Sequence, residues 1–425
     1  MSASVSRAPA RFVMSSPSPV PAATAAFDSR RLRGRAALLL LLPMALLAGC
    51  ATTPRTSILY TGDPIIDGRA ELAAARPQDR VMWNYRIAAS ALRVGNFEEA
   101  KARLDDAILS MGGIINNATD AAKARRLFSG EDAKLFIGEP YERVMAYYYR
   151  ALLYWRDGQP DNARACYRTG QFIDSDAEAA EYKSDYVLLD YLDGLVSAKL
   201  AADGADALKR ANANARGQAL PPYDPQSNVM VFAEFGSGPR KYAGGEFGEQ
   251  LRFMVSESPA RSAALTVDGR TVALPAYDDL NFQATTRGGR VMDYILGNKA
   301  VFKRTTSNVG DVALIGGVIA AENMRRYNGS KNHDMENAAI ALGAIGLISK
   351  IASAATTPNA DLRMWNNLPQ RLSFAALRLP AGQHPATLDF FDASGRKLVG
   401  LTQELTLVVD DTTRDTVVFL SELKR

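Results

Sequence analysis

Two stretches of this chain repeat one pattern of helix, turn and helix, which restricts the fold of its first half more than any other feature. The first stretch covers residues 83–107 with a turn at Gly95, and the second covers residues 147–170 with a turn at Gly158. Apolar residues recur in both at the spacing of amphipathic helices. Small residues occupy matching positions where paired helices approach each other: Ala88 and Ala151, Ala100 and Ala163, Ala107 and Gly170. Because one helical pair cannot bury its own apolar face, we expect additional helices to complete a stack.

The repeated pattern resembles the tetratricopeptide repeat, a helix-turn-helix unit of about 34 residues. The two units are not in direct succession, since a partly helical insertion over residues 112–139 separates them, and a third, degenerate unit covers residues 186–211. We therefore predict a tetratricopeptide-like helical domain over residues 81–217.

In such repeats the first helix of each unit lines a concave groove. The resemblance therefore implies a partner-binding surface that contains Tyr85, Arg93, Tyr148, Trp155 and Arg156. Aromatic and arginine side chains dominate interface energies when a partner desolvates them. The alternative is that the aromatic residues pack between helices and that the two arginines stack on or cap their own helices.

The pattern changes after the proline-rich residues 221–225, and residues 218–425 are predicted to form a β-sandwich-like domain. Asp268-Gly269 within Leu265–Val272 predicts a hairpin with a type I′ turn. The other predicted strands are Val229–Phe235, Leu251–Val255, Thr387–Phe391, Leu398–Leu401, Leu405–Val409 and Val417–Leu420. The fold class is thus α+β and multidomain, with the helical array first.

A helical insertion over residues 289–356 is expected to interrupt these strands. Small residues four apart, at Ala313, Gly317 and Ala321, favour close helix packing in either a soluble hairpin or a membrane hairpin. The apolar runs are shorter than the roughly 20 residues that a spanning helix needs, which favours the soluble hairpin.

The N-terminus carries arginines, then the apolar residues 36–48, then Cys50 after Ala-Gly. These are the regions of a secretory signal, and the segment resembles a bacterial lipoprotein signal, which implies that Cys50 is acylated and becomes the new N-terminus. We predict a signal peptide over residues 1–49, with Met14 as a second possible start, and a tether over residues 50–80. Ala51, in place of aspartate, favours the periplasmic face of the outer membrane. The alternative is an ordinary secreted protein with a chance cysteine.

Cleavage would also change the charge. The full chain has 50 basic and 46 acidic residues, and the first 49 positions hold six Arg and one Asp, which leaves 44 basic against 45 acidic residues. A nearly neutral protein lacks the electrostatic footprint of nucleic-acid binding. We therefore expect no nucleic-acid partner.

Three further segments, residues 138–155, 360–369 and 377–384, resemble an uncharacterised family of bacterial tetratricopeptide-containing envelope lipoproteins. The resemblance implies an outer-membrane lipoprotein linked to cell-envelope or cell-wall assembly.

Few residues in the sequence match a catalytic, metal-binding or phosphate-binding motif. Cys166 is interpreted as a small buried hydrophobe, and neither His333 nor His384 begins a spaced set of zinc ligands. Residues 236–241 are glycine-rich but lack the ending of a phosphate loop, so we expect a turn there. We predict no cofactor, no metal, no small-molecule substrate and no enzymatic activity. The expected function is a lipid-anchored adaptor for an envelope protein; the alternatives are a cell-wall hydrolase and a secretion or pilus-assembly lipoprotein.

Overall fold

Helical hairpins make up the first half of the described chain. The computed structural model describes residues 58–115, 134–175, 180–245, 250–255, 258–286 and 360–423. The α-helices are α2 (Pro64–Ala74), α3 (Arg80–Arg93), α4 (Phe97–Ile115), α6 (Pro140–Arg156), α7 (Pro160–Asp174), α8 (Val187–Lys199), α9 (Ala205–Asn214) and α10 (Leu280–Thr285), and the short 3₁₀ turns are η1 (Pro77–Asp79), η3 (Ala180–Tyr182) and η4 (Val399–Leu401). Gly95 and Gly158 adopt positive φ angles of 74° and 73° between α3 and α4 and between α6 and α7. Both predicted turns are therefore confirmed.

Within the described residues, the strands form two four-stranded sheets and one two-stranded ribbon. Their bounds are β1 (Val229–Ser237), β2 (Arg240–Gly244), β3 (Gln250–Met254), β4 (Ser262–Val267), β5 (Arg270–Pro275), β6 (Asp278–Asp279), β7 (Pro369–Leu377), β8 (Gly382–Phe391), β9 (Gln403–Val409) and β10 (Thr416–Ser421). We call the sheet with strand order β10-β1-β7-β6 the central sheet and the sheet with order β5-β4-β8-β9 the outer sheet. Strands β2 and β3 pair only with each other among the described strands.

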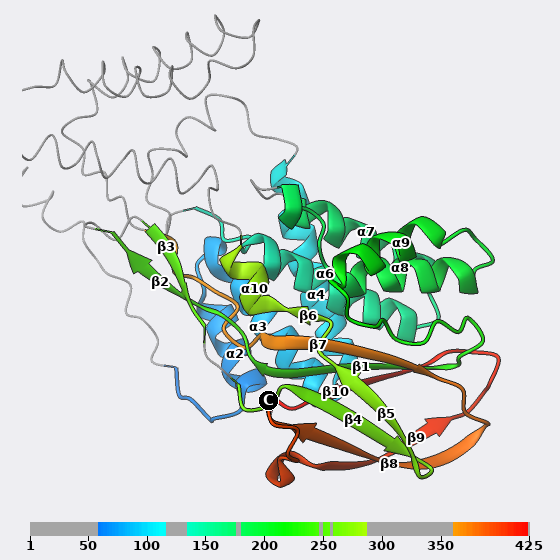
Figure 1. Cartoon of the computed structure of the whole chain (residues 1–425). Helices are drawn as coiled ribbons and strands as arrows, with labels where there is room; N and C mark the ends of the chain where they lie inside the picture. The colour runs from blue at the N-terminus through cyan, green and yellow to red at the C-terminus, as the bar shows by residue number, and fades with distance from the viewer. Residues whose placement is uncertain are drawn as a thin grey trace, which may run out of the picture. The chain divides into compact units, whose positions relative to one another are not determined.

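The central sheet is covered on both faces (Figure 1). In β1, Met230 and Phe232 belong to the core shared with the helices, whereas Val231 and Phe235 belong to the core shared with the outer sheet. Successive side chains of a strand point to opposite faces, so one strand serves both cores. The chain is accordingly a mixed α+β fold.

Most predicted strands are confirmed, and one is wrong. Val229–Phe235 lies within β1, and the Asp268-Gly269 turn joins β4 to β5 with φ angles of 48° and 77°. The predicted strand Leu398–Leu401 is wrong: Val399–Leu401 form the turn η4, which follows the isolated bridge between Phe391 and Lys397. The prediction missed β7, which lies in the middle of the central sheet. The predicted insertion over residues 289–356 lies outside the described residues.

Two predicted boundaries need correction. The chain from Ile58 onward forms one compact unit, and its larger core runs from the helices into β1 and β7, so residue 217 does not separate two units. The predicted tether over residues 50–80 is too long, because α2 lies within it and packs on α3 with Leu72 buried. Gly68 permits that packing, since a Cβ there would lie 2.7 Å from Cγ1 of Ile87.

Helices α8 and α9 meet through two glycines, and this contact gives a test of the packing. A Cβ on Gly204 would lie 2.4 Å from the carbonyl oxygen of Gly194 and 2.9 Å from its Cα. Both are backbone atoms that cannot rotate away, so we expect Gly204→Ala to lower the free energy of unfolding by about 1–3 kcal/mol in urea denaturation. The matched control is Gly112→Ala in α4, where a Cβ meets nothing within 4 Å and where Ala is favoured by about 0.5–1 kcal/mol. Equal urea midpoints for the two variants would contradict the close approach.

Candidate functional site

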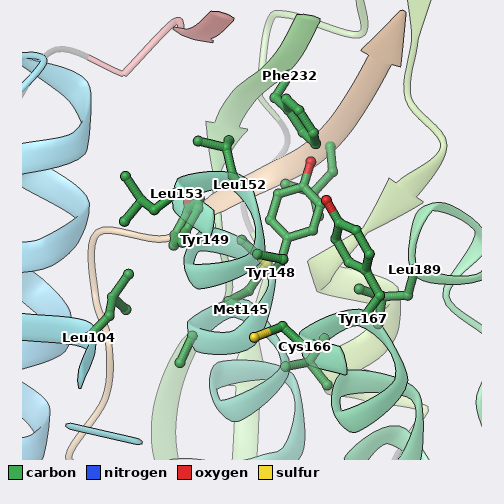
Figure 2. Close-up of a cluster of buried hydrophobic side chains, with 14 of the residues drawn as sticks. Leu104, Met145, Tyr148, Tyr149, Leu152, Leu153, Cys166, Tyr167, Leu189 and Phe232 are labelled. Atoms are coloured by element: carbon green, nitrogen blue, oxygen red, sulfur yellow. The ribbon is translucent and has the colours of Figure 1, made fainter. Parts of the chain in front are cut away.

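The helix faces predicted to bind a partner are covered by the protein's own central sheet and by the loop before β7. Tyr85 of α3 stacks on Trp365 with ring centroids 4.3 Å apart, and Tyr148 and Trp155 of α6 each lie edge-on to Phe232 of β1, at 6.1 Å. Figure 2 shows Tyr148 pointing toward Phe232. All three predicted side chains are at most 2% exposed. The aromatic faces of α3 and α6 are therefore buried by other residues of the same chain and are not open to a partner.

The two arginines predicted to bind a partner differ in their burial. The side chain of Arg93 is 3% exposed and pairs with Glu234 of β1 at 2.7 Å, and the same carboxylate accepts a hydrogen bond from the Tyr149 hydroxyl at 2.5 Å. Arg156 is exposed, and its guanidinium lies 4.0 Å from the centre of the Phe97 ring. The prediction of a partner-binding face is therefore corrected: Arg93, Tyr148 and Trp155 hold the helices on the central sheet, Tyr85 packs on Trp365 of the loop before β7, and among the five predicted residues only Arg156 lies at the surface.

Two segments far apart in the sequence, residues 138–155 and 360–369, meet at Glu142. This carboxylate, on the first turn of α6, accepts hydrogen bonds from Lys241 Nζ at 2.6 Å and from the Trp365 backbone N–H at 2.6 Å. It also accepts from the Glu139 N–H at 2.7 Å, which completes a capping box at the start of α6, where Pro140 is the first residue. The side chains of Glu142 and Lys241 are 0% and 1% exposed. Burial raises the pKa of Glu142, and the ammonium of Lys241 opposes that rise. Such a buried pair fixes the relative position of three segments.

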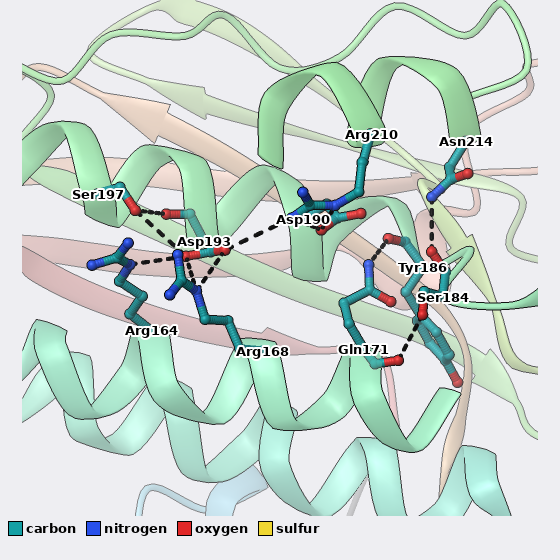
Figure 3. Close-up of polar contacts among 10 residues, drawn as sticks. All are labelled: Arg164, Arg168, Gln171, Ser184, Tyr186, Asp190, Asp193, Ser197, Arg210 and Asn214. Atoms are coloured by element: carbon teal, nitrogen blue, oxygen red, sulfur yellow. Dashed lines mark hydrogen bonds and ion pairs between the residues drawn. The ribbon is translucent and has the colours of Figure 1, made fainter. Parts of the chain in front are cut away.

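A second buried acidic group connects α7, α8 and α9. Asp193 of α8 accepts from Arg164 and Arg168 of α7, and Asp190 accepts from Arg210 of α9, all at 2.9–3.0 Å (Figure 3). Burial raises the pKa of Asp190 to about 6, although Arg210 opposes the rise. Both carboxylates have guanidinium partners, so these ion pairs connect α8 to α7 and to α9.

A surface cleft of about 290 Å³ lies between α2, α3 and the loop before β7. It is lined by Tyr60, Pro64, Asp67, Gly68, Glu71, Trp83, Arg86, Ser90, Asn366 and Asn367. Arg86 donates from Nε and Nη2 to the Met364 carbonyl at 3.2 and 2.8 Å, and its guanidinium lies 4.7 Å from the centre of the Trp83 ring. Asn367 closes one wall by donating to the Arg86 carbonyl and to the Ser90 hydroxyl. The cleft combines aromatic walls with a cation, and we take it as the candidate functional site.

A second hollow, of about 260 Å³, lies between α4, α6 and α7. Its cation, Arg150, already pairs with Asp105 at 2.6 Å and lies 3.5 Å above the Tyr154 ring. Cys166 also lines it, and burial raises the pKa of this thiol to about 11. The thiol is therefore protonated at neutral pH and buried, as the sequence predicted.

The histidines do not form a reactive group in the described structure. His384 is held by Asp268 at 2.6 Å from Nδ1 and by the Pro380 carbonyl at 2.9 Å from Nε2, and these two acceptors raise its pKa. His333 and Cys50 lie outside the described residues. Within the described ranges, no group of three or more His, Cys, Asp or Glu side chains is placed to hold a metal ion.

Comparison with protein-family models, curated proteins and solved structures finds no match to this chain. None of the helices in the described ranges has the length and apolar character needed to cross a membrane.

Asp278 links stability to pH near neutrality. It accepts hydrogen bonds from the Val187 and Leu188 N–H groups at 2.8 and 2.9 Å, yet burial outweighs them and raises its pKa to about 7. The folded state then keeps a proton that the unfolded chain has released, so the free energy of unfolding falls as pH rises from about 4 to about 7. We expect Asp278→Asn to reduce this slope by up to about 1.4 kcal/mol per pH unit in urea denaturation between pH 5 and 7.

The control for that measurement is Asp392→Asn. Hydrogen bonds from Ser394 and Arg396 lower the pKa of Asp392, so it stays ionised throughout the measured window. Its replacement should leave the slope unchanged. Parallel slopes for the Asp278 variant and the unmodified protein would show that Asp278 does not titrate there.

Proposed function

We propose that the protein is a lipid-anchored, non-catalytic adaptor of the bacterial cell envelope that docks a protein partner in the cleft between α2 and α3. In this proposal Cys50 carries the acyl chains, a tetratricopeptide-like array and a β-sandwich-like part form one compact unit, and the anchor holds the protein at the periplasmic face of the outer membrane. The anchor is supported by the N-terminal segment, in which an apolar run is followed by Ala-Gly and then Cys50. The aromatic faces of α3 and α6 are already covered by the loop before β7 and by the central sheet, which supports a docking site elsewhere on the surface.

The observation that carries the proposal is the place of the cleft along the chain. Tyr60 lines the cleft and is 64% exposed. Tyr60 follows Cys50 by ten positions in the sequence, and a fully extended chain covers at most about 3.5 Å per position, or roughly 35 Å. A partner at the cleft would thus be held close to the lipid surface, where the anchor raises the local concentration of partners.

In vivo photocrosslinking tests the docking site. A photoreactive residue is placed at the exposed Asn366 in the cleft and, as a control, at Phe172 of α7, which is 77% exposed and does not line it. We expect one dominant envelope protein to be captured from position 366 and not from position 172. Equal or scattered adducts from both positions would contradict a docking cleft, and trimming of peptidoglycan by the purified protein would favour the hydrolase alternative.

Replacing the cysteine tests the anchor. We expect Cys50→Ser to abolish acylation, to move the protein from the membrane fraction to the soluble fraction, and to remove the crosslink from position 366. Fractionation and mass spectrometry of the N-terminus measure these changes. An unchanged N-terminus and distribution would support the alternative of a secreted protein with a chance cysteine.

A further inference from the structure

Two carboxylates of α2 line the cleft, although their positions do not favour the helix. Asp67 and Glu71 are four positions apart, so their like charges are neighbours on one face of α2. The Thr61 N–H donates to Asp67 and lowers the pKa of its carboxyl, which is therefore ionised at neutral pH. Glu71 lies in the last turn of α2, where the helix dipole disfavours an anion and which contains no basic residue. Helix stability therefore does not explain this acidic pair.

The cation of the cleft is held by the wall that α3 and the loop before β7 form. Arg86 donates from Nε and Nη2 to the Met364 carbonyl, and its guanidinium lies over the Trp83 ring. No ion pair joins it to Asp67 or Glu71 in the described structure. With two carboxylates against one guanidinium, the cleft has an excess of one negative charge. Charge complementarity therefore favours a cationic occupant.

Asn367 adds a buried acceptor to the lining of the cleft. Its Nδ2 donates to the Arg86 carbonyl at 3.0 Å and to the Ser90 hydroxyl at 3.1 Å. Because a carbonyl can only accept, these contacts fix which end of the amide is the nitrogen. The Oδ1 atom is buried and has no hydrogen-bond partner among the described residues. An unpaired buried acceptor is unfavourable, so the cleft favours an occupant that donates hydrogen bonds.

We propose that the cleft binds the side chain of a lysine in an extended segment of the partner, with the ammonium beside Glu71 and Asp67 and with the methylene chain against the Tyr60 ring. This inference rests on the proposed docking function and specifies the group that is recognised. The Tyr60 ring is 64% exposed, and the face of an aromatic ring attracts a cation. The cleft volume of about 290 Å³ is close to the lower limit for ligand pockets, which suits one side chain.

The hydrogen bonds already made by the two carboxylates favour an ammonium over a guanidinium. A guanidinium binds best to both oxygens of one carboxylate. Oε1 of Glu71 accepts from the Tyr60 hydroxyl, and both oxygens of Asp67 accept from the turn at Thr61 and Gly62. The three donors of an ammonium are not held in one plane, so it can use single remaining lone pairs on separate acceptors.

Fluorescence anisotropy with the purified full chain tests the inference. The probes are hexapeptides Gly-Ser-X-Lys-Ser-Gly with fluorescein at the N-terminus and an amide at the C-terminus, where X is each of the twenty amino acids. Each is also made with Nε-acetyl-lysine and with arginine in place of lysine. We expect at least one lysine peptide to bind, and its acetylated form to bind about tenfold or more weakly. Glu71→Gln should weaken the lysine peptide about tenfold, because it removes one of the two attracting charges.

Two matched variants separate loss of charge from loss of the fold. Glu98→Gln makes the same change at an 81% exposed side chain of α4 that does not line the cleft, and it should leave binding unchanged. Tyr60→Phe keeps the ring and removes the hydroxyl that donates to Glu71. It should bind the lysine peptide at least as tightly as the unmodified protein does, because more of the Glu71 carboxylate is then available to the ammonium.

Several results would overturn the inference: no lysine peptide binds, the acetylated or arginine peptides bind as tightly as the lysine peptides, Glu71→Gln binds like the unmodified protein, or Tyr60→Phe binds more weakly. If crosslinks from position 366 persist alongside any of these results, docking at the cleft stands and recognition of a lysine is wrong. If those crosslinks are scattered as well, the docking function itself is wrong.

Discussion

Glu142→Ala is expected to lower the free energy of unfolding by about 3–5 kcal/mol. The substitution leaves the Lys241 ammonium buried, with only the Arg363 carbonyl as a described acceptor, and removes the acceptor of the Trp365 backbone N–H. An uncompensated buried charge is far more unfavourable than the loss of a surface ion pair. Urea denaturation followed by circular dichroism measures the difference.

A double variant separates charge from volume. Glu142→Met combined with Lys241→Met replaces both charges by apolar side chains of similar length, so we expect it to recover much of the stability lost by Glu142→Ala. Glu98→Ala is the matched control, since this acidic side chain of α4 is 81% exposed and pairs only with Lys101 in the described structure; it should change stability by no more than about 0.5 kcal/mol. A loss below 1 kcal/mol for Glu142→Ala would mean that the pair does not hold the three segments together.

Local sequence predicted the helices because their signals are local. Gly95 and Gly158 supply the positive φ at the turns, and Pro140 stands at the first position of α6, where its missing N–H is not needed. The Asp268-Gly269 hairpin follows from the same kind of short-range signal.

Strand β7 was missed because its burial contradicts its composition. Gln370 and Arg371 are 4% and 5% exposed, and Arg371 Nη1 donates to the Ala260 carbonyl and to the Gln370 side chain. A strand that is buried on both faces is recognised in a sequence by a continuous apolar run, and these polar residues interrupt that run. Only the acceptors, more than one hundred residues away in the case of Ala260, explain their burial.

The part of the molecule that covers the aromatic helix faces could likewise not be predicted from local sequence. Periodicity shows that Tyr148 and Trp155 lie on an apolar helix face, but a binding surface and a packed interior need the same side chains. The difference lies in β1, which aligns in parallel with β10 and antiparallel with β7. That topology positions Asp415 to accept from Trp155 Nε1 at 2.8 Å.

The cleft could be predicted only in part. Asn366 and Asn367 belong to a segment that the family resemblance had marked, but nothing in the sequence pairs that segment with Arg86, 278 positions before Met364. A single arginine on a helix is ordinarily a solvated charge. Its contacts with the Met364 carbonyl and Trp83 distinguish it from one.

Trp365→Ala is expected to lower the free energy of unfolding by about 3–5 kcal/mol, because a large side chain is removed from a close-packed site. The Trp365 ring is 1% exposed, stacks on Tyr85 and meets the edge of Tyr149 at 5.8 Å. Its indole N–H has no hydrogen-bond partner in the described part of the chain, so Trp365→Phe loses volume alone.

Trp155→Phe serves as the comparison, because it loses similar volume together with the hydrogen bond to Asp415. We expect Trp365→Phe to be the milder of the two by about 1 kcal/mol. A Trp365→Ala variant within 1 kcal/mol of the unmodified protein would mean that the ring does not anchor the loop that carries Met364 and Asn366.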